Sequence, residues 1–220
     1  AYTAWWQMDS KLSAPKNSNL KTVMDFSFFD KINTAKNEQT ETWFKGLDRV
    51  YNNFVYDFLY PNPASVLAFI ENHDTDRFLG EGDNLPMLKQ ASTLLLTTRR
   101  IPQLYYGTEI MMNGVKSKSD GYVRKDFPGG WTGDTETALT AAGRSKIQNE
   151  CYNFYKTLLN WRKGNDVIAK GNMVQFMVQN GVYAYARQHE GKTVFVMLNG
   201  TDAETTVPLK FYKEILKDSK

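Results

Sequence analysis

Apolar and polar residues follow two different periods along the chain, and the change between them divides it into two parts. Up to about residue 163, apolar residues form helical stripes and continuous runs. The predicted helices cover residues 41–60, about 83–100 and 145–163. The predicted strands are the runs KTVMDFSFF (21–29), SVLAFI (65–70) and IPQLYYGTEI (101–110). Strand and helix therefore alternate three times, which favours parallel strands joined by crossover helices.

Local signals mark the ends of these helices. Asp83 or Asn84 is expected to cap the second helix, with Pro86 in its first turn. Gly164-Asn165 ends the third helix. A charged, glycine-rich loop is expected between the last predicted strand and that helix, over roughly 111–143.

Past Gly171 the apolar period changes to two, which is typical of strands with one buried face. The hairpin signals Asn180-Gly181 and Glu190-Gly191 separate three such strands. The strands are NMVQFMVQ (172–179), VYAYARQ (182–188) and TVFVML (193–198). We therefore predict an α/β part over residues 1–167 and a small antiparallel all-β domain over residues 168–220.

Composition narrows the classes of function. The net charge is +3 and the basic residues are scattered, so nucleic-acid binding is not expected. No apolar stretch reaches the ~18 residues of a membrane span, so no membrane partner is expected. The single cysteine, Cys151, excludes an internal disulfide framework. Aromatic residues make up 14% of the chain, which fits a large core better than a sugar-binding surface, although both interpretations stay open.

The stretch FIENHDTDR (69–77) concentrates ionisable residues at the end of a predicted buried strand. In parallel α/β folds, functional side chains gather at the carboxyl ends of strands. Asn72, His73 and Asp74 would therefore face a pocket. The structural alternative is a solvated loop in which Asp74 or Asp76 caps a turn.

Several motifs, taken together, resemble the α-amylase superfamily, glycoside hydrolase family 13. FIENHDTDR is similar to the family's fourth motif, F-x-x-N-H-D. TVMDF (22–26) resembles the sixth barrel strand, and IPQLYYGTE (101–109) the eighth, with Arg100 in place of a glycine. VRKDFPGGW (123–131) is similar to the next loop of the neopullulanase and cyclomaltodextrinase branch. The resemblance implies the C-terminal part of a (β/α)8 barrel, about strands six to eight, ahead of the all-β domain.

The resemblance also implies roles for four residues near the predicted strand end. Asp74 would be the catalytic carboxylate that stabilises the transition state, and His73 would bind the sugar at the bond that is cut. Arg77 and Arg124 are weaker candidates for sugar contacts. For each arginine, an ion pair with a nearby carboxylate is the favoured alternative.

Five other residues of the motifs are assigned to the framework or left open. Asp76 and Glu71 are expected to support the loop around Asp74. Glu109 and Asp25 are expected to be structural. Trp131 is compatible with lining the cleft or with anchoring its own loop.

Two further parts of the family's machinery do not occur in these 220 residues. The nucleophile Asp lies in G-x-R-x-D-x-x-x-H, and the residue four before His189 is Tyr185. The acid Glu lies in a short G-E stretch, and AYTAWWQ (1–7) resembles the segment just after it. We therefore expect a C-terminal piece of an amylase-like enzyme, inactive by itself, that self-associates through exposed barrel edges.

For the parent protein we expect a glycoside hydrolase that acts on α-glucosidic bonds of starch-like glucans, pullulan or cyclomaltodextrins by retaining double displacement. The alternatives are a non-catalytic glucan-binding module and a transglycosylase of the same family. The partner is an α-glucan or maltooligosaccharide. No metal or cofactor is assigned to this chain, because calcium in the family is bound by other segments. A periplasmic or secreted location is slightly favoured over a cytoplasmic one.

Overall fold

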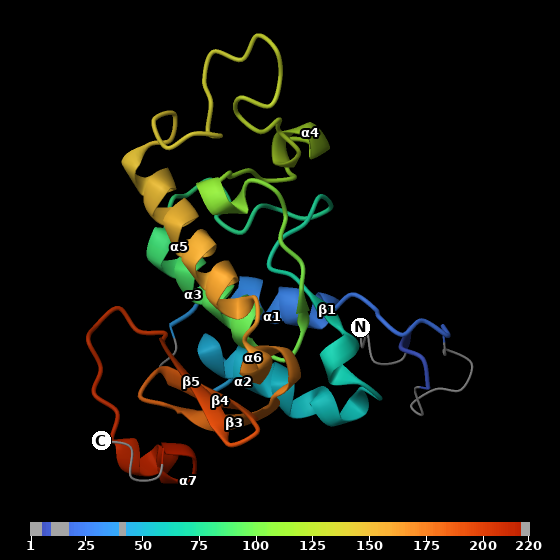
Figure 1. Cartoon of the computed structure of the whole chain (residues 1–220), viewed down its shortest axis with the longest axis vertical. Coiled ribbons are helices and arrows are strands. Elements are labelled where there is room, and N and C mark those ends of the chain that lie inside the picture. The colour runs from blue at the N-terminus through green and yellow to red at the C-terminus, as the bar shows by residue number, and fades with distance from the viewer. Residues whose placement is uncertain (1–5, 10–17, 40–42, 217–220) are drawn as a thin grey trace. The chain divides into compact units, whose positions relative to one another are not determined.

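The computed structural model describes residues 6–9, 18–39 and 43–216 of the chain. Most of AYTAWWQ (1–7) and the last four residues therefore lie outside the described parts. The chain forms two compact units (Figure 1). The sheet unit comprises residues 1–68, 97–101 and 164–220, and the helical unit comprises residues 69–96 and 102–163. The division between residues 167 and 168 stays a prediction.

The sheet unit contains a three-stranded antiparallel sheet packed against helices. Its helices and strands are α1 (Phe26–Ala35), α2 (Leu47–Val55), β1 (Leu67–Ala68), α6 (Asp166–Lys170), β3 (Asn172–Gln179), β4 (Val182–His189), β5 (Lys192–Asn199) and α7 (Lys213–Leu216). Short 3-10 helices cover Tyr56–Leu59, Pro63–Ser65 and Leu209–Tyr212. Helices α2 and α6 pack on strands β3 and β4.

The predicted small sheet is confirmed, with the strand order β3-β4-β5. Asn180, Gly181, Glu190 and Gly191 all have positive φ, between 48° and 75°, as two-residue hairpin turns require. The central strand is buried on both faces, including the large rings of Tyr183 and Tyr185. This burial explains why the strand reads VYAYA rather than alternating apolar and polar residues.

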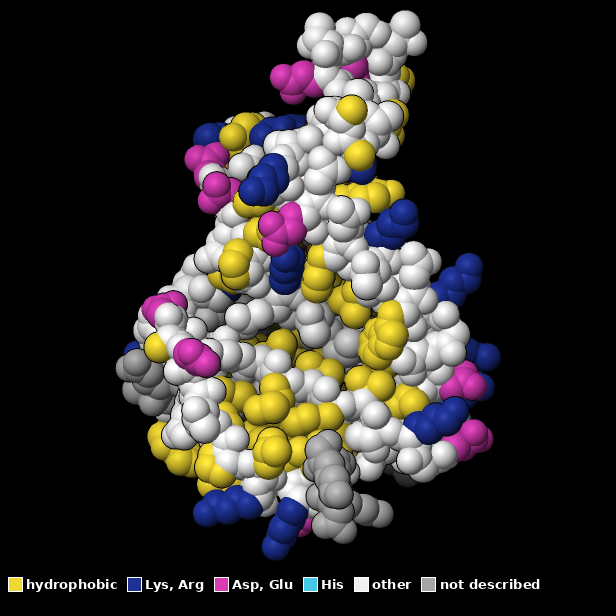
Figure 2. All heavy atoms as spheres, turned by 60° about the vertical axis from the view of Figure 1, so that its left-hand side comes forward, with side chains coloured by type: hydrophobic (Ala, Val, Ile, Leu, Met, Phe, Trp, Pro, Cys, Tyr) yellow, Lys and Arg dark blue, Asp and Glu magenta, His cyan; other side chains and the backbone are white. Residues whose placement is uncertain are grey.

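The edges of the sheet and the tail that follows it leave apolar side chains at the surface. Figure 2 shows apolar side chains gathered in the lower part of the view. The exposed large apolar residues of the sheet and tail include Val174, Met177, Met197, Leu209 and Phe211. Self-association through such surfaces stays a prediction.

The prediction of a strand over residues 21–29 is wrong for most of its length. Met24 makes a single parallel bridge with Leu67, and helix α1 begins two residues later. The Asp25 carboxylate ends the extended segment, because it accepts a hydrogen bond from the Phe28 N–H at 2.9 Å and so caps the helix.

The helix predicted over 41–60 is shorter than its apolar pattern. Residues 41 and 42 lie outside the described parts, and α2 begins at Leu47 after Gly46, whose φ is 54°. Val50 and Phe54 are buried as expected, whereas Trp43 and Phe58 are exposed. The exposed pair lies outside the α-helical residues, which removes both side chains from the predicted buried stripe.

The other two predicted strands are reduced to pairs of residues, β1 and β2 (Ile101–Pro102). Their backbones still lie side by side, because the Ile101 N–H donates to the Val66 carbonyl at 2.9 Å. On the other side, the Asp25 N–H donates to the Leu67 carbonyl at 2.7 Å. The three predicted strands are therefore adjacent, although the regular ladder is short.

The helical unit is built from α3 (Leu85–Thr97) and α5 (Lys146–Arg162), with α4 (Asp120–Val123) and a 3-10 turn over Thr108–Ile110. Both long helices were predicted, and a side chain caps the start of each in the structure. Asn84 Oδ1 accepts from the Met87 N–H at 3.0 Å, and Ser145 forms a capping box with Gln148. The Ser92 and Tyr155 hydroxyls share a buried hydrogen bond between the two helices.

Candidate active site

The candidate site is formed by a turn. This turn comes after β1 and after the next two buried residues, Phe69 and Ile70. Asn72 Oδ1 accepts a hydrogen bond from the Asp74 N–H at 2.8 Å, and Thr75 Oγ1 accepts from the Asn72 N–H at 3.0 Å. These bonds hold the turn from inside, since Asn72 and Thr75 are buried. The side chains of His73 and Asp74 are instead 61% and 60% exposed, so both are open to a ligand.

Arg124 joins this turn from a separate segment of the helical unit. Its Nη2 lies 3.0 Å from Asp74 Oδ1, and its Nε donates to the His73 carbonyl at 2.9 Å. His73 Nε2 lies 3.2 Å from Asp74 Oδ2. Three of the four predicted site residues, His73, Asp74 and Arg124, therefore meet at the exposed Asp74 carboxylate. We call these three residues the Asp74 cluster. The ion pair weighed as the alternative role of Arg124 is present.

Helix α4 positions Arg124. The Ser119 hydroxyl caps this short helix by accepting from the Tyr122 N–H at 3.1 Å. Asp120 lies one turn before Arg124, and its carboxylate pairs with Arg124 Nη2 at 2.9 Å. Arg124 thus bridges two carboxylates, of which Asp74 belongs to the predicted motif.

Arg77, the fourth predicted residue, does not reach the surface. Its side chain is 1% exposed and pairs with Glu71 at 3.2 Å. Its guanidinium also stacks on the rings of Tyr105 and Tyr106, at 4.0 and 4.9 Å from their centroids. The ion pair, which was the favoured alternative for Arg77, is the contact observed, and a sugar contact is not available to it in this structure.

The Glu71 carboxylate is the centre of this buried network. It accepts hydrogen bonds from the Thr108 hydroxyl, the Phe78 N–H and Arg77. Burial raises the pKa of Glu71 above its ordinary value, and those three donors oppose the rise. At the other end of the turn, Asp76 accepts from the Lys116 N–H at 2.6 Å. The expectation that Glu71 and Asp76 support the loop is confirmed.

The buried network also connects the two segments that form the Asp74 cluster. Arg77 Nε donates to the carbonyl of Val123 at 3.0 Å, and Val123 precedes Arg124. The Arg77 backbone N–H donates to the Gly114 carbonyl at 2.9 Å. A buried arginine therefore sets the distance between the turn that carries Asp74 and the helix that carries Arg124.

The sequence and fold of the chain are similar to those of known proteins. Residues 173–220 match the model of the cyclo-malto-dextrinase C-terminal domain. A cyclomaltodextrin glucanotransferase of Thermoanaerobacterium thermosulfurigenes is 31% identical over 208 residues, which is 91% of this chain and 26% of that protein. An α-amylase of Niallia circulans is 29% identical over 211 residues, which is 92% of this chain and 36% of that protein.

The solved structures agree. The crystal structure of the α-amylase from Geobacillus thermoleovorans, complexed with acarbose, matches with a TM-score of 0.64 at 22% identity. The match covers 83% of this chain and 37% of that one. The chain belongs to the α-amylase superfamily, glycoside hydrolase family 13.

Within this superfamily the fold is the C-terminal part of the (β/α)8 barrel followed by a small antiparallel sheet. The chain spans about a quarter to a third of the length of the curated relatives named above. The Asp74 cluster is formed by the turn after β1, which carries the motif FIENHDTDR, and by the segment of α4 and Arg124, at which the motif VRKDFPGGW begins.

The remaining predicted residues of the α-amylase-like motifs take structural positions or stay open. Asp25 is buried, caps α1 and pairs with Arg100 at 3.0 Å, as its structural assignment predicts. Glu109 lies half-buried near Cys151, where burial first and the Glu109 charge second raise the pKa of the thiol to about 12. Trp131 has an exposed ring, and its backbone N–H donates to Asp134 at 3.1 Å.

Two sets of partners escaped the sequence analysis. Asp120 could have been found, because it lies four residues before Arg124 and acidic and basic residues at that spacing pair on a helix. Thr108 and the Tyr105–Tyr106 pair could not, because they meet Glu71 and Arg77 from 28 to 37 residues away through tertiary packing.

Two negative findings concern the described residues alone. Within residues 6–9, 18–39 and 43–216, no three His, Cys, Asp or Glu side chains are grouped so that they could hold a metal ion. No helix in the same ranges is long and apolar enough to cross a membrane.

Proposed function

We propose that this chain supplies part of the active site of an α-amylase-family enzyme that cleaves α-glucosidic bonds of starch-like glucans, pullulan or cyclomaltodextrins. The observation that carries the proposal is the exposed Asp74 carboxylate, which lies between His73 and Arg124 on the loop of the matching motif. This carboxylate faces solvent, has hydrogen-bond acceptor positions still open and is paired with an arginine. It is therefore suited to accept hydrogen bonds from sugar hydroxyls.

The proposed mechanism is retaining double displacement. A nucleophilic carboxylate and a general acid lie about 5 to 5.5 Å apart in such enzymes, and the transition state resembles an oxocarbenium ion. We assign Asp74 to the third role, in which its carboxylate accepts hydrogen bonds from sugar hydroxyls that strengthen as positive charge develops on the ring. The nucleophile and the acid belong to the two motifs that these 220 residues do not contain.

Arg124 and His73 have supporting roles in this proposal. Arg124 holds one oxygen of the Asp74 carboxylate, and the His73 side chain lies against the other. Because the Asp74 and His73 side chains are largely exposed, a sugar hydroxyl can replace water at the carboxylate oxygens without burying an unpaired charge.

A second candidate is transglycosylation, in which a sugar hydroxyl replaces water as the acceptor. It is favoured by the name of the Thermoanaerobacterium relative, a cyclomaltodextrin glucanotransferase. Asp74 would have the same role in both reactions, because it acts on the glycosyl unit and not on the acceptor. Product analysis separates them, since transfer gives longer or cyclic glucans and hydrolysis gives shorter ones.

The test replaces Asp74 with Asn in a longer protein that carries this chain together with the nucleophile motif and the general-acid motif. The amide keeps the shape but loses the charge and one hydrogen-bond acceptor, so we expect kcat on maltoheptaose to fall about 10²- to 10⁴-fold and KM to rise by up to about tenfold. Asp83→Asn is the matched control, because Asp83 is exposed and lies outside the cluster. Near-normal turnover by Asp74→Asn would reject the role.

The same measurement addresses the binding-module alternative. If the longer protein binds maltoheptaose but neither hydrolyses nor transfers it, the chain is part of a glucan-binding protein and the catalytic proposal fails.

A further inference from the structure

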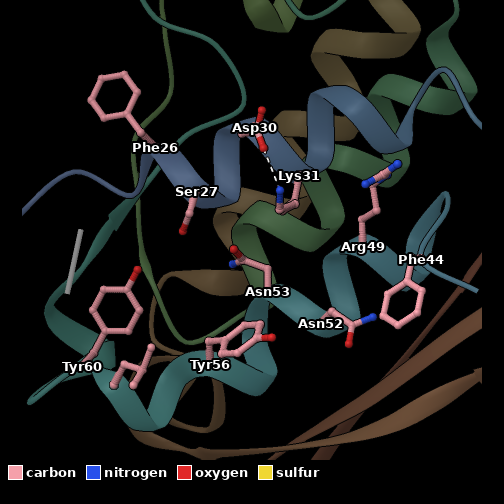
Figure 3. Close-up of a pocket in the computed structure, with 11 residues that line it drawn as sticks. Phe26, Ser27, Asp30, Lys31, Phe44, Arg49, Asn52, Asn53, Tyr56 and Tyr60 are labelled. Atoms are coloured by element: carbon pink, nitrogen blue, oxygen red, sulfur yellow. Dashed lines mark hydrogen bonds and ion pairs between the residues drawn. The ribbon is translucent and has the colours of Figure 1, made fainter. Parts of the chain in front are cut away.

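A pocket separate from the Asp74 cluster lies in the sheet unit, between α1 on one side and α2 with the following 3-10 helix on the other (Figure 3). Its volume is about 360 Å³, which is in the range of small-ligand pockets. The pocket is lined by Phe26, Ser27, Asp30, Lys31, Phe44, Arg49, Asn52, Asn53, Tyr56, Leu59 and Tyr60. None of these residues belongs to the Asp74 cluster or to the motif that carries it.

The rim of the pocket carries aromatic rings that are exposed to solvent. Phe26, Tyr56 and Phe44 are 49%, 53% and 65% exposed. Phe44 also has a φ of 64°, a backbone conformation that bulky residues rarely adopt. Exposed rings on a concave surface indicate an interaction site, because burying them against a ligand removes apolar area from water.

Polar side chains lie between these rings. Figure 3 shows the Ser27 hydroxyl and the Asn53 amide between the ring of Phe26 above and the rings of Tyr56 and Tyr60 below. Asn53 lines the pocket and is 8% exposed. The Ser27 hydroxyl donates to Asp25 at 2.6 Å and keeps an oxygen lone pair that can accept a further hydrogen bond.

The charges of the pocket are already paired. Lys31 Nζ lies 2.9 Å from Asp30 Oδ2, and Arg49 Nη2 lies 2.6 Å from a carboxylate oxygen of Glu38. Each cation in the lining therefore has its own anion. A phosphate or carboxylate ligand would have to displace one of these partners, whereas a neutral ligand would not.

From these observations we propose that the pocket binds a neutral pyranose, as a second saccharide site of the protein. A pyranose has an apolar ring face that packs on Tyr56 or Phe26, and hydroxyls that match the Asn53 amide and the Ser27 oxygen. The lining of the pocket favours a saccharide whichever reaction the Asp74 cluster serves. The choice of an α-glucan as the sugar rests on the proposed function.

The experiment follows backbone amide NMR signals of the chain during titration with maltotriose. Saturable shifts of residues 26–31 and 52–60 are expected, separate from those of residues 72–76 at the Asp74 cluster. Tyr56→Ala should weaken the first set of shifts about tenfold or more, because a stacking ring is lost. Phe211→Ala is the matched control, since Phe211 is an exposed aromatic residue of the same unit outside the pocket.

The outcomes separate the two proposals. If residues 26–31 and 52–60 do not respond to maltotriose, if Tyr56→Ala leaves their affinity unchanged, or if sodium phosphate produces the same shifts, the second site is wrong. If they respond while residues 72–76 do not, the second site stands and the Asp74 cluster loses its assignment as a sugar site. Asp74→Asn should leave the shifts of 26–31 and 52–60 intact.

Discussion

Two clusters of aspartate and arginine in this protein have the same chemistry and opposite surroundings. In the sheet unit, Arg100 pairs with Asp25 and with Asp57, both at 3.0 Å, and all three side chains are buried. In the helical unit, Arg124 pairs with Asp74 at 3.0 Å and with Asp120 at 2.9 Å, and these side chains are exposed. The length of an ion pair therefore does not separate a structural cluster from a functional one.

The difference lies in what remains available for a ligand. The Arg100 guanidinium also donates to the Pro63 carbonyl and lies over the rings of Phe54 and Tyr60, so its surroundings are saturated. The Asp74 carboxylate has two protein partners and faces water over most of its surface. Exposure combined with free hydrogen-bonding capacity is what makes the Asp74 cluster the candidate for chemistry.

The largest effect is expected in the buried cluster. Among the residues that the structure describes, Arg100→Met removes the ion-pair partner of Asp25 and one of the two ion-pair partners of Asp57. Both carboxylates are buried. Removing one partner of a buried ion pair costs about 3–5 kcal/mol. We therefore expect the unfolding free energy measured by urea titration to fall by that amount. A loss below about 1 kcal/mol would show that the cluster is not a structural centre.

A smaller effect is expected from Arg77→Met in the network below the Asp74 cluster. Glu71 keeps hydrogen bonds from Thr108 and the Phe78 N–H, and Arg77 Nη2 has no partner among the described residues, so we expect a loss of about 2–3 kcal/mol. The loss should grow with pH. A buried carboxyl whose folded pKa lies above its unfolded value destabilises the fold once the pH exceeds the unfolded pKa of ~4.3.

The measurement is urea unfolding of the wild type and of Arg77→Met at pH 5 and pH 8. Arg77→Lys is the matched variant, because it keeps the charge near Glu71 and should recover part of the loss. A loss that is equal at both pH values would contradict the role of Arg77 as the counter-ion of Glu71.

Part of this molecule could be predicted because the signal is local. The capping box of Ser145 with Gln148 and the turns at Asn180-Gly181 and Glu190-Gly191 are formed by residues within three positions of each other. Asp74 and His73 were identified for a similar reason, since the motif that carries them is contiguous. In each case the chemistry is complete within a few residues.

The rest depends on contacts between distant segments. Apolar runs correctly predicted that Val66, Ala68 and Phe69 are buried, but the length of β1 depends on hydrogen bonds to residues 23–25 and 101. Arg100 gives a second example. The sequence shows that this arginine stands where the family motif has a glycine, but it does not show what the arginine contacts. Its partners Asp25 and Asp57 lie 75 and 43 residues away, so nothing in the local pattern indicates them.

The central claim is that the Asp74 cluster binds a glucan and contributes little to stability. Its most direct test is calorimetric titration with maltoheptaose of two proteins, Tyr56→Ala and the double variant Tyr56→Ala with Asp74→Ala, in which the second pocket is removed from both. We predict that loss of Asp74 weakens binding about tenfold or more and changes the unfolding free energy by less than about 1 kcal/mol, as for an exposed ion pair. Unchanged binding, or a loss of stability comparable to that of Arg100→Met, would contradict the account.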